Sequence, residues 1–268
     1  MTSVVEQLKA ELGSPGLVLS EADEVAAYTS DWTRKFSGVA PAVLRPRDTD
    51  EVRRCVLACR KLGLALVPQG GNTGLVGGSV PRAGEVVLSL SRLNKIESFD
   101  AASATVQVQA GVVLQALHEN LAGRGCVFPV DLGARGSCQI GGMIATNAGG
   151  IKVLRYGHMR EQVLSLEVVL ADGTVMSNLH GLKKNNTGLD LKHVFIGSEG
   201  MLGIITRAVL QARPAPEAVQ TALLALDTRD RLPELLTMLR ERLRGLSSLE
   251  IITQDSIALY KEVEPGTR

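Results

Sequence analysis

The sequence predicts an α+β fold, because its helices are mixed with short strands that follow one another directly. Short apolar strands are expected at residues 86–90, 95–100 and 105–109, with no helix between them. Further along, the dipeptide Asp172-Gly173 separates two more strands and is a strong signal for a hairpin turn. Antiparallel pairing of this kind disfavours a doubly wound parallel sheet.

Length and composition restrict the class of protein. The 268 residues suit one large or two medium domains, and the 45% of apolar residues include only 3% aromatics. The core is therefore expected to consist mainly of Val, Leu, Ile and Ala. A formal net charge of +1 from dispersed ionic residues gives no reason to expect nucleic acid as a partner. The chain has neither a run of ~18 apolar residues nor a signal-peptide core, so we expect no membrane span and a cytoplasmic location.

The amino-terminal part begins with two helices and continues with a β–α–β unit. Asp48 or Thr49 can cap the third helix, and Gly63 ends it. The strand that follows delivers a glycine-rich loop at its end, where α/β units often bind ligands. The helices are expected at 2–12, 20–28 and 50–62, and the strands at 42–44 and 64–67.

The remaining elements continue the mixed pattern up to a linker at residues 212–216, which read ARPAP. Before the linker we expect a helix at 112–124 and strands at 163–171, 174–177 and 203–210. Beyond it we expect strands at 220–226 and 249–253 and helices at 229–244 and 254–262. We interpret residues 217–268 as the start of a second α+β domain that is cut short, because some fifty residues form only a marginal core.

The loop at residues 68–81, PQGGNTGLVGGSVP, predicts a phosphate-binding site. Five glycines expose main-chain N–H groups, and the loop contains no Lys or Arg. A row of uncovered amides suits a diphosphate held by backbone dipoles. The candidate cofactor-binding residues of this loop are Pro68, Gln69, Gly70, Gly71, Asn72, Thr73, Gly74, Gly78 and Ser79.

A second glycine-rich run, residues 131–150, reads DLGARGSCQIGGMIATNAGG, and a third glycine set lies at 197–203. Two such loops can hold an elongated cofactor from two sides. The candidates here are Asp131, Gly136, Ser137, Gly141, Gly142, Ala145, Thr146, Asn147, Gly149, Gly203, Ile204 and Ile205.

Two other nucleotide-binding motifs fit poorly. A dinucleotide-binding Rossmann motif requires G-x-G-x-x-G leading directly into a helix, whereas the first loop leads into Ser79-Val80-Pro81. A Walker loop requires Gly-Lys-Ser/Thr, which the chain lacks.

At these residues the sequence resembles the vanillyl-alcohol oxidase and p-cresol methylhydroxylase (PCMH) superfamily of FAD-binding proteins. Within it, the chain is similar to the group of D-2-hydroxyglutarate dehydrogenase, D-lactate dehydrogenase and the glycolate oxidase D-subunit. The resemblance extends over most of residues 42–210, with the family's motifs in the family's order. The matching strings are PQGGNTGLVGGSVP, DLGARGSCQIGGMIATNAGG, LRYGHMREQVLSLEVVLADGT, KKNNTGLDL and IGSEGMLGIIT.

The resemblance implies a PCMH-type FAD-binding domain of two α+β subdomains at residues 1–213 (core 42–211), followed by the start of a cap, or substrate, domain at 217–268. The first loop would hold the pyrophosphate, the second run would line the flavin and the ribityl chain, and the strand at 203–205 would approach the adenine. Covalently flavinylated relatives often place a histidine in the first loop. Residues 68–81 contain neither His nor Cys, so we expect noncovalent FAD.

Three residues depart from the pattern of these relatives. Asn185 and Leu189 occupy places that are usually acidic and aromatic, and Met201 replaces a commoner threonine. These differences could tune the flavin surroundings or the entry to the substrate cavity, but they leave the cofactor signature intact.

The chemistry implied by the resemblance is oxidation of a D-2-hydroxy acid, of the 2-hydroxyglutarate, lactate or glycolate class, to the 2-oxo acid. A hydride would leave Cα for flavin N5 while a base takes the hydroxyl proton. In relatives the base and the metal belong to segments beyond residue 268, so we assign no catalytic residue and no metal here. Arg34 is a candidate for binding the substrate carboxylate.

Two interpretations of function remain open. The chain is part of an FAD-dependent dehydrogenase that passes electrons to an acceptor of unknown identity, or it is a noncatalytic FAD-binding fragment or subunit that needs a partner chain. A homodimer is also compatible with the sequence.

Overall fold

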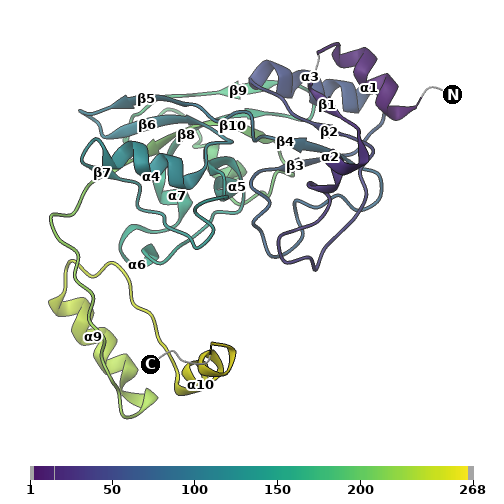
Figure 1. The fold of residues 1–268 in the computed structure, drawn as a ribbon. Coiled ribbons are helices and arrows are strands. Elements are labelled where there is room, and N and C mark those ends of the chain that lie inside the picture. The colour runs from purple at the N-terminus through teal and green to yellow at the C-terminus, as the bar shows by residue number, and fades with distance from the viewer. Residues whose placement is uncertain (1–2, 15, 265–268) are drawn as a thin grey trace.

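The computed structural model describes residues 3–14 and 16–264, and it confirms the α+β fold. Two main sheets lie side by side, with the carboxy-terminal helices set apart from them (Figure 1). The four-stranded sheet has the order β1-β2-β4-β3, and the five-stranded sheet has the order β5-β6-β10-β8-β9. We refer to the first sheet with α1–α3 as the first subdomain and to the second sheet with α4–α8 as the second subdomain.

The first subdomain contains the expected β–α–β unit with an insertion. Strands β2 and β3 are both parallel to β4, which lies between them and is completely buried. The sequence predicted the three strands but not this order. The elements are α1 (Val4–Leu12), β1 (Val18–Leu19), α2 (Ala22–Ala26), β2 (Val43–Leu44), α3 (Thr49–Lys61), β3 (Leu66–Gln69) and β4 (Val86–Ser89).

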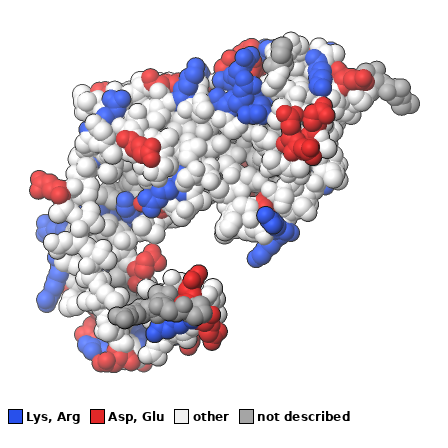
Figure 2. Space-filling model, viewed as in Figure 1, with Lys and Arg blue, Asp and Glu red and all other residues white. Residues whose placement is uncertain are grey.

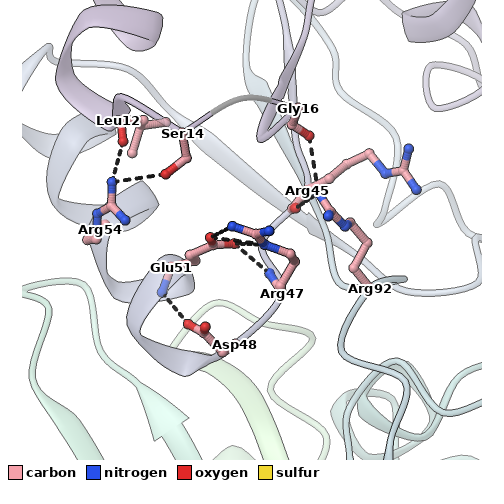
Figure 3. Close-up of polar contacts among 9 residues, drawn as sticks. All are labelled: Leu12, Ser14, Gly16, Arg45, Arg47, Asp48, Glu51, Arg54 and Arg92. Carbon is pink, nitrogen blue, oxygen red and sulfur yellow. Dashed lines mark hydrogen bonds and ion pairs between the residues drawn. The ribbon is translucent and has the colours of Figure 1, made fainter.

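Polar contacts fix the start of α3 and attach α1 to it (Figure 3). The Asp48 side chain accepts a hydrogen bond from the Glu51 N–H at 2.8 Å, which caps the helix as predicted. The Glu51 carboxylate also pairs with Arg47 at 2.7 Å. Further along α3, the Arg54 guanidinium donates to the Leu12 carbonyl at the end of α1. These contacts fix the position of α3. The next strand, β3, leads into the glycine loop.

The second subdomain is built on a long antiparallel pair, β8 and β10, with β6 beside β10. The predicted hairpin turn connects β8 to β9, and Gly173 adopts the positive φ of 83° that such a turn requires. Helices α4, α5 and α7 lie together below this sheet in Figure 1. The elements are β5 (Ile96–Asp100), β6 (Thr105–Gln109), α4 (Leu114–Ala122), β7 (Cys126–Val127), α5 (Ile140–Ala145), α6 (Val153–Tyr156), α7 (Met159–Gln162), β8 (Val163–Val169), β9 (Val175–Ser177), α8 (Lys192–Phe195) and β10 (Ile204–Gln211).

A buried carboxylate joins the two subdomains. Glu167 on β8 accepts hydrogen bonds from the Thr49 hydroxyl of α3 at 2.6 Å and from the Thr206 hydroxyl of β10 at 2.8 Å. It also pairs with Arg207 at 3.0 Å, and Arg207 in turn reaches Glu97 at 2.9 Å. Burial by itself would raise the pKa of Glu167, but the bonds from Thr49 and Thr206 and the charge of Arg207 outweigh it and lower the pKa.

Two strands predicted in the carboxy-terminal segment are not formed. Residues 220–226 and 249–253 form no strand, and the elements after β11 are helical. Both segments are largely exposed and pair with no other described strand, which leaves no ladder to satisfy their backbone groups. Within the expected linker, Arg213–Pro214 forms a short strand that pairs with β7. The elements are β11 (Arg213–Pro214), the 3₁₀ turn η1 (Arg229–Arg231), α9 (Leu232–Arg242) and α10 (Gln254–Val263).

The two carboxy-terminal helices contribute little to the core. Neither α9 nor α10 buries a residue, and Figure 2 shows a notch between this segment and the main body. The same view shows Lys and Arg interspersed with Asp and Glu, without a large patch of one sign. Within the described ranges, no helix has the length and apolar character needed to cross a membrane. The boundary between residues 213 and 217 remains a prediction.

Candidate cofactor site

The candidate site is a cavity of about 390 Å³ between the two subdomains. Its walls come from the first glycine loop, from α5 and the residues before it, and from the start of β10. The predicted residues that line it are Pro68, Gln69, Gly70, Gly71, Asn72, Thr73, Gly74, Gly78, Ser79, Gly141, Gly142, Ala145, Thr146, Gly203, Ile204 and Ile205. The fold therefore brings together segments from all three glycine-rich parts of the sequence.

Several glycines allow backbone segments to approach one another at this cavity. A Cβ added to Gly71 would lie 2.0 Å from the Ser137 carbonyl oxygen, so the first loop touches the second run directly. A Cβ on Gly141 would lie 2.7 Å from the Ala110 Cβ. The sequence predicted that these glycines approach a ligand. At Gly71 and Gly141 the structure shows that the missing side chain allows a neighbouring segment of the protein to pack closely.

The first loop presents unpaired donors. None of the main-chain N–H groups of residues 70–79 donates a hydrogen bond to another described residue. A row of unpaired amides in a glycine-rich loop can bind an anionic ligand. The lining contains no Lys, Arg or His, and Glu199 is its only charged residue among those described. Any attraction for phosphate must therefore come from these amides.

The polar side chains of the loop hold its shape. The Gln69 amide donates to the carbonyls of Tyr28 at 2.9 Å and of Ser79 at 2.8 Å, which ties the start of the loop to its end. Asn72 donates to the Ser30 carbonyl at 2.7 Å and accepts from the Ser79 hydroxyl at 2.7 Å. Gln69, Asn72 and Ser79 therefore position the amides through contacts within the protein.

We expect Asn72→Ala to weaken FAD binding about tenfold and to lower the unfolding free energy by about 1–2 kcal/mol. The substitution removes both side-chain bonds, and it puts alanine at a φ of 52°, where asparagine is tolerated better. Asn72→Gly separates the two effects, because glycine adopts this φ without strain. Fluorescence titration with FAD and thermal unfolding check the prediction. Wild-type affinity in both variants would contradict it.

The other predicted residues lie outside the cavity lining. Asp131 pairs with Arg135 at 3.3 Å and Lys152 at 3.7 Å, and its carbonyl packs against Gly150. The other four predicted residues either contact other parts of the protein or are exposed. Asn147 accepts from the Arg160 N–H at 3.0 Å, Gly149 packs on His158, Ser137 packs on Gly71, and Gly136 is exposed.

Arg34 is also absent from the lining. It is exposed in a tight turn with a φ of 58°, and its N–H donates to the Asp31 carbonyl. The turn belongs to the segment that braces the glycine loop, since Phe36 lies against Gly77 and Ser30 accepts from Asn72. The carboxylate-binding role of Arg34 stays a prediction.

The sequence reasoning missed several lining residues. Most lie between or beside the predicted ones, so proximity in sequence was the available signal. They are Val76, Leu90, Leu132, Gly133, Ala134, Cys138, Gln139, Met143, Ala148, Glu199 and Gly200. Burial raises the pKa of the Cys138 thiol, which keeps it uncharged at neutral pH.

The titratable groups at the cavity are few. Among the described residues, no group of three or more His, Cys, Asp or Glu side chains is placed to bind a metal ion. The Glu199 carboxylate is exposed at the cavity wall, close to Gly78. The unpaired amides of the first loop make this cavity suited to a phosphate-bearing ligand.

Comparisons with known proteins agree with this geometry. The family described as "FAD binding domain" matches residues 40–177. A mitochondrial D-2-hydroxyglutarate dehydrogenase of Bos taurus is 50% identical over 78% of this chain and 39% of its own length. A mitochondrial D-2-hydroxyglutarate dehydrogenase of Arabidopsis thaliana is 41% identical over 98% of this chain and 47% of its own. A D-2-hydroxyglutarate–pyruvate transhydrogenase of Saccharomyces cerevisiae is 42% identical over 88% of this chain and 48% of its own length.

A solved structure of alkyldihydroxyacetonephosphate synthase superimposes with a TM-score of 0.76 at 24% identity, covering 88% of this chain and 49% of that one. This match supports the fold. The chain thus spans less than half the length of these relatives.

The prediction of a cytoplasmic location is wrong by this comparison, because several of the relatives are named mitochondrial proteins. The prediction depended on the lack of a secretory signal core and of a membrane span. Those features test for secretion and membrane insertion, and they say nothing about import into an organelle.

Proposed function

This chain belongs to the FAD binding domain family, and we propose that it forms the flavin-holding part of an enzyme that oxidises a D-2-hydroxy acid to the 2-oxo acid. The supporting relatives are named for D-2-hydroxyglutarate. We therefore favour 2-hydroxyglutarate over lactate and glycolate as the substrate. In domain terms, residues 1–213 would hold the cofactor, and residues 217–268 would begin the cap.

The observation that carries the proposal is the row of unpaired amides at residues 70–79, in a loop that lines a cavity without cationic side chains. A diphosphate is an acceptor-only group that such amides satisfy. Each hydrogen bond to a charged phosphate contributes about 1.5–3 kcal/mol, so a few suffice for tight noncovalent binding. When bound, FAD would supply the hydride acceptor.

The residues of this chain would hold and orient the cofactor. Gly70, Gly71 and their neighbours in the loop would bind the phosphates through the main chain, and Gly141 and Gly142 would close the opposite wall. Gly203–Ile205 would contribute backbone groups at a third side. The apolar residues Leu90, Leu132 and Met143 would exclude water from the same space.

A second candidate function is favoured by the scarcity of titratable groups in the cavity. Oxidation of an alcohol needs a base within hydrogen-bond reach of the hydroxyl. Glu199 is the one charged lining residue of the described chain, and it is exposed. If no other segment supplies a base, the chain is an FAD-binding subunit that works with a partner chain.

Flavin reduction distinguishes the two functions. We expect the purified protein to bind FAD, and the visible flavin absorption to bleach anaerobically with D-2-hydroxyglutarate but not with its L-enantiomer. D-Lactate and glycolate serve as comparison substrates. Bound FAD without bleaching by any of these acids supports the noncatalytic subunit. A protein that binds no FAD contradicts both functions.

A further inference from the structure

A second hollow, a groove of about 570 Å³, lies where the two subdomains meet. One side comes from α3 and β3, and the other comes from the end of β8, the turn after it and the segment that leads into β10. Pro68, Gly200, Gly203 and Ile204 line both the groove and the candidate cofactor cavity, so the two hollows are neighbours. All other lining residues of the groove are absent from the lining of the cavity.

The groove is mostly apolar and is partly open to water. Met201 is 83% exposed and Leu202 is 51% exposed, while Leu64, Leu66 and Leu170 are half-buried. Large apolar side chains gathered on an exposed surface normally mark a binding surface. Pockets for small molecules have about this size, are mainly apolar and often lie between domains. The groove therefore has the features of a ligand site.

Met201 is one of the residues at which the chain departs from the pattern of its relatives. The structure places it in the lining of the groove and outside the lining of the cofactor cavity. A side chain with this exposure contributes little to the core, so the stability of the fold does not explain the methionine. Methionine is flexible and polarizable, and it is common on surfaces that adapt to apolar ligands.

One unpaired cation lies at the groove. Arg60 on α3 is exposed, and its guanidinium has neither a hydrogen bond nor an ion pair with another described residue. The other charged lining residue of the described chain is Asp172, which accepts a hydrogen bond from the Thr174 N–H at 2.8 Å. Bonds from Thr174 are the main cause that lowers the pKa of Asp172, and the nearby charge of Arg60 adds to it. Asp172 is thus engaged by its own turn, whereas Arg60 is available to an anion.

We propose that the groove binds an aliphatic monocarboxylate, with its alkyl chain along the apolar residues and its carboxylate on the Arg60 guanidinium. A carboxylate matches the planar guanidinium through two parallel hydrogen bonds. A phosphate monoester carries nearly two charges, and a single free cation close to the acidic Asp172 suits a monoanion better. This site is separate from the cofactor cavity and does not depend on the proposed function.

The probe is decanoate, titrated calorimetrically into the protein with and without added FAD. We expect one decanoate per chain, and we expect that FAD does not displace it. Octanoate should bind about tenfold more weakly, because two buried methylene groups are lost. Decyl phosphate should also bind more weakly than decanoate.

Two variants place the ligand in the groove. Met201→Thr should raise the Kd for decanoate about fivefold, because it removes apolar contact. Arg60→Gln should also raise the Kd for decanoate about fivefold, while the Kd for decanol stays unchanged. Both side chains are exposed, so the melting temperature of each variant should match that of the wild type.

The matched control is Arg53→Gln, since Arg53 is exposed on the same helix, pairs with Asp50 at 3.3 Å and lies outside the groove lining. It should keep the wild-type Kd for decanoate. The inference is overturned if decanoate does not bind, if FAD displaces it, or if several molecules bind per chain. An unchanged Kd in either Met201→Thr or Arg60→Gln would also overturn it. Failure of the protein to bind FAD would overturn only the proposed function.

Discussion

Gly71→Ala is expected to lower the unfolding free energy by about 3 kcal/mol and to abolish most of the affinity for FAD. The new Cβ would lie 2.0 Å from the oxygen and 2.9 Å from the carbon of the Ser137 carbonyl. These obstacles are backbone atoms, and Ser137 is itself held by a hydrogen bond from its N–H to Ala134 at 2.9 Å. The two glycine-rich segments must therefore move apart, which distorts both walls of the cavity.

Thermal unfolding and flavin content check this expectation. A loss of about 3 kcal/mol corresponds to a fall in melting temperature of about 8 °C for a chain of this size. Gly136→Ala is the control, since it lies in the same run as Ser137 and its added Cβ meets no atom within 4 Å. It should stay within about 0.5 kcal/mol of the wild type. Equal stability of Gly71→Ala and Gly136→Ala would refute the packing argument.

Glu167→Ala is expected to lower the unfolding free energy by about 4 kcal/mol, the second large effect. The Glu167 side chain is only 7% exposed and binds Thr49, Thr206 and Arg207. Its removal leaves two hydroxyls without their acceptor and a guanidinium without its buried partner. Because Thr49 belongs to α3, the substitution also loosens the contact between the subdomains, and we expect weaker FAD binding as a consequence.

The pH dependence of stability gives an independent check on Glu167. Its pKa in the folded protein is lowered from the ordinary value of 4.5. The ionised carboxylate therefore stabilises the fold above about pH 4.5, and this contribution disappears as the pH falls through the folded-state pKa. Glu167→Gln should lose less stability than the wild type over that acidic range, as measured by urea unfolding.

The control for both experiments is Glu97→Gln. Glu97 binds the same Arg207 at 2.9 Å, but its side chain is 21% exposed and it lies on the edge strand β5. We expect a loss of at most about 1 kcal/mol. A loss as large as that of Glu167→Ala would show that Arg207, rather than the buried carboxylate, is the important member of the network.

Local sequence signals predicted most helices and strands well. They failed where the structure depends on pairing between strands that are distant in sequence. The strand at Thr105–Gln109 and the hairpin at Asp172-Gly173 follow from turn residues and apolar pattern within a few positions. Residues 220–226 and 249–253 have a similar apolar pattern but no strand partner, so they remain irregular. The insertion of β4 between β2 and β3 is likewise a long-range pairing that no local pattern reveals.

The sequence by itself predicted a diphosphate-binding loop, because the glycines and the absence of cationic residues in the first loop are read directly from the chain, and its resemblance to a known family implied FAD. Only the tertiary structure decided which groups face the cavity. Gly142 and Thr146 line it, whereas Asp131, Asn147 and Gly149 in the same run contact other parts of the protein. The physical reason is that burial and hydrogen-bond satisfaction depend on segments far apart in sequence, which meet only when the two subdomains pack together.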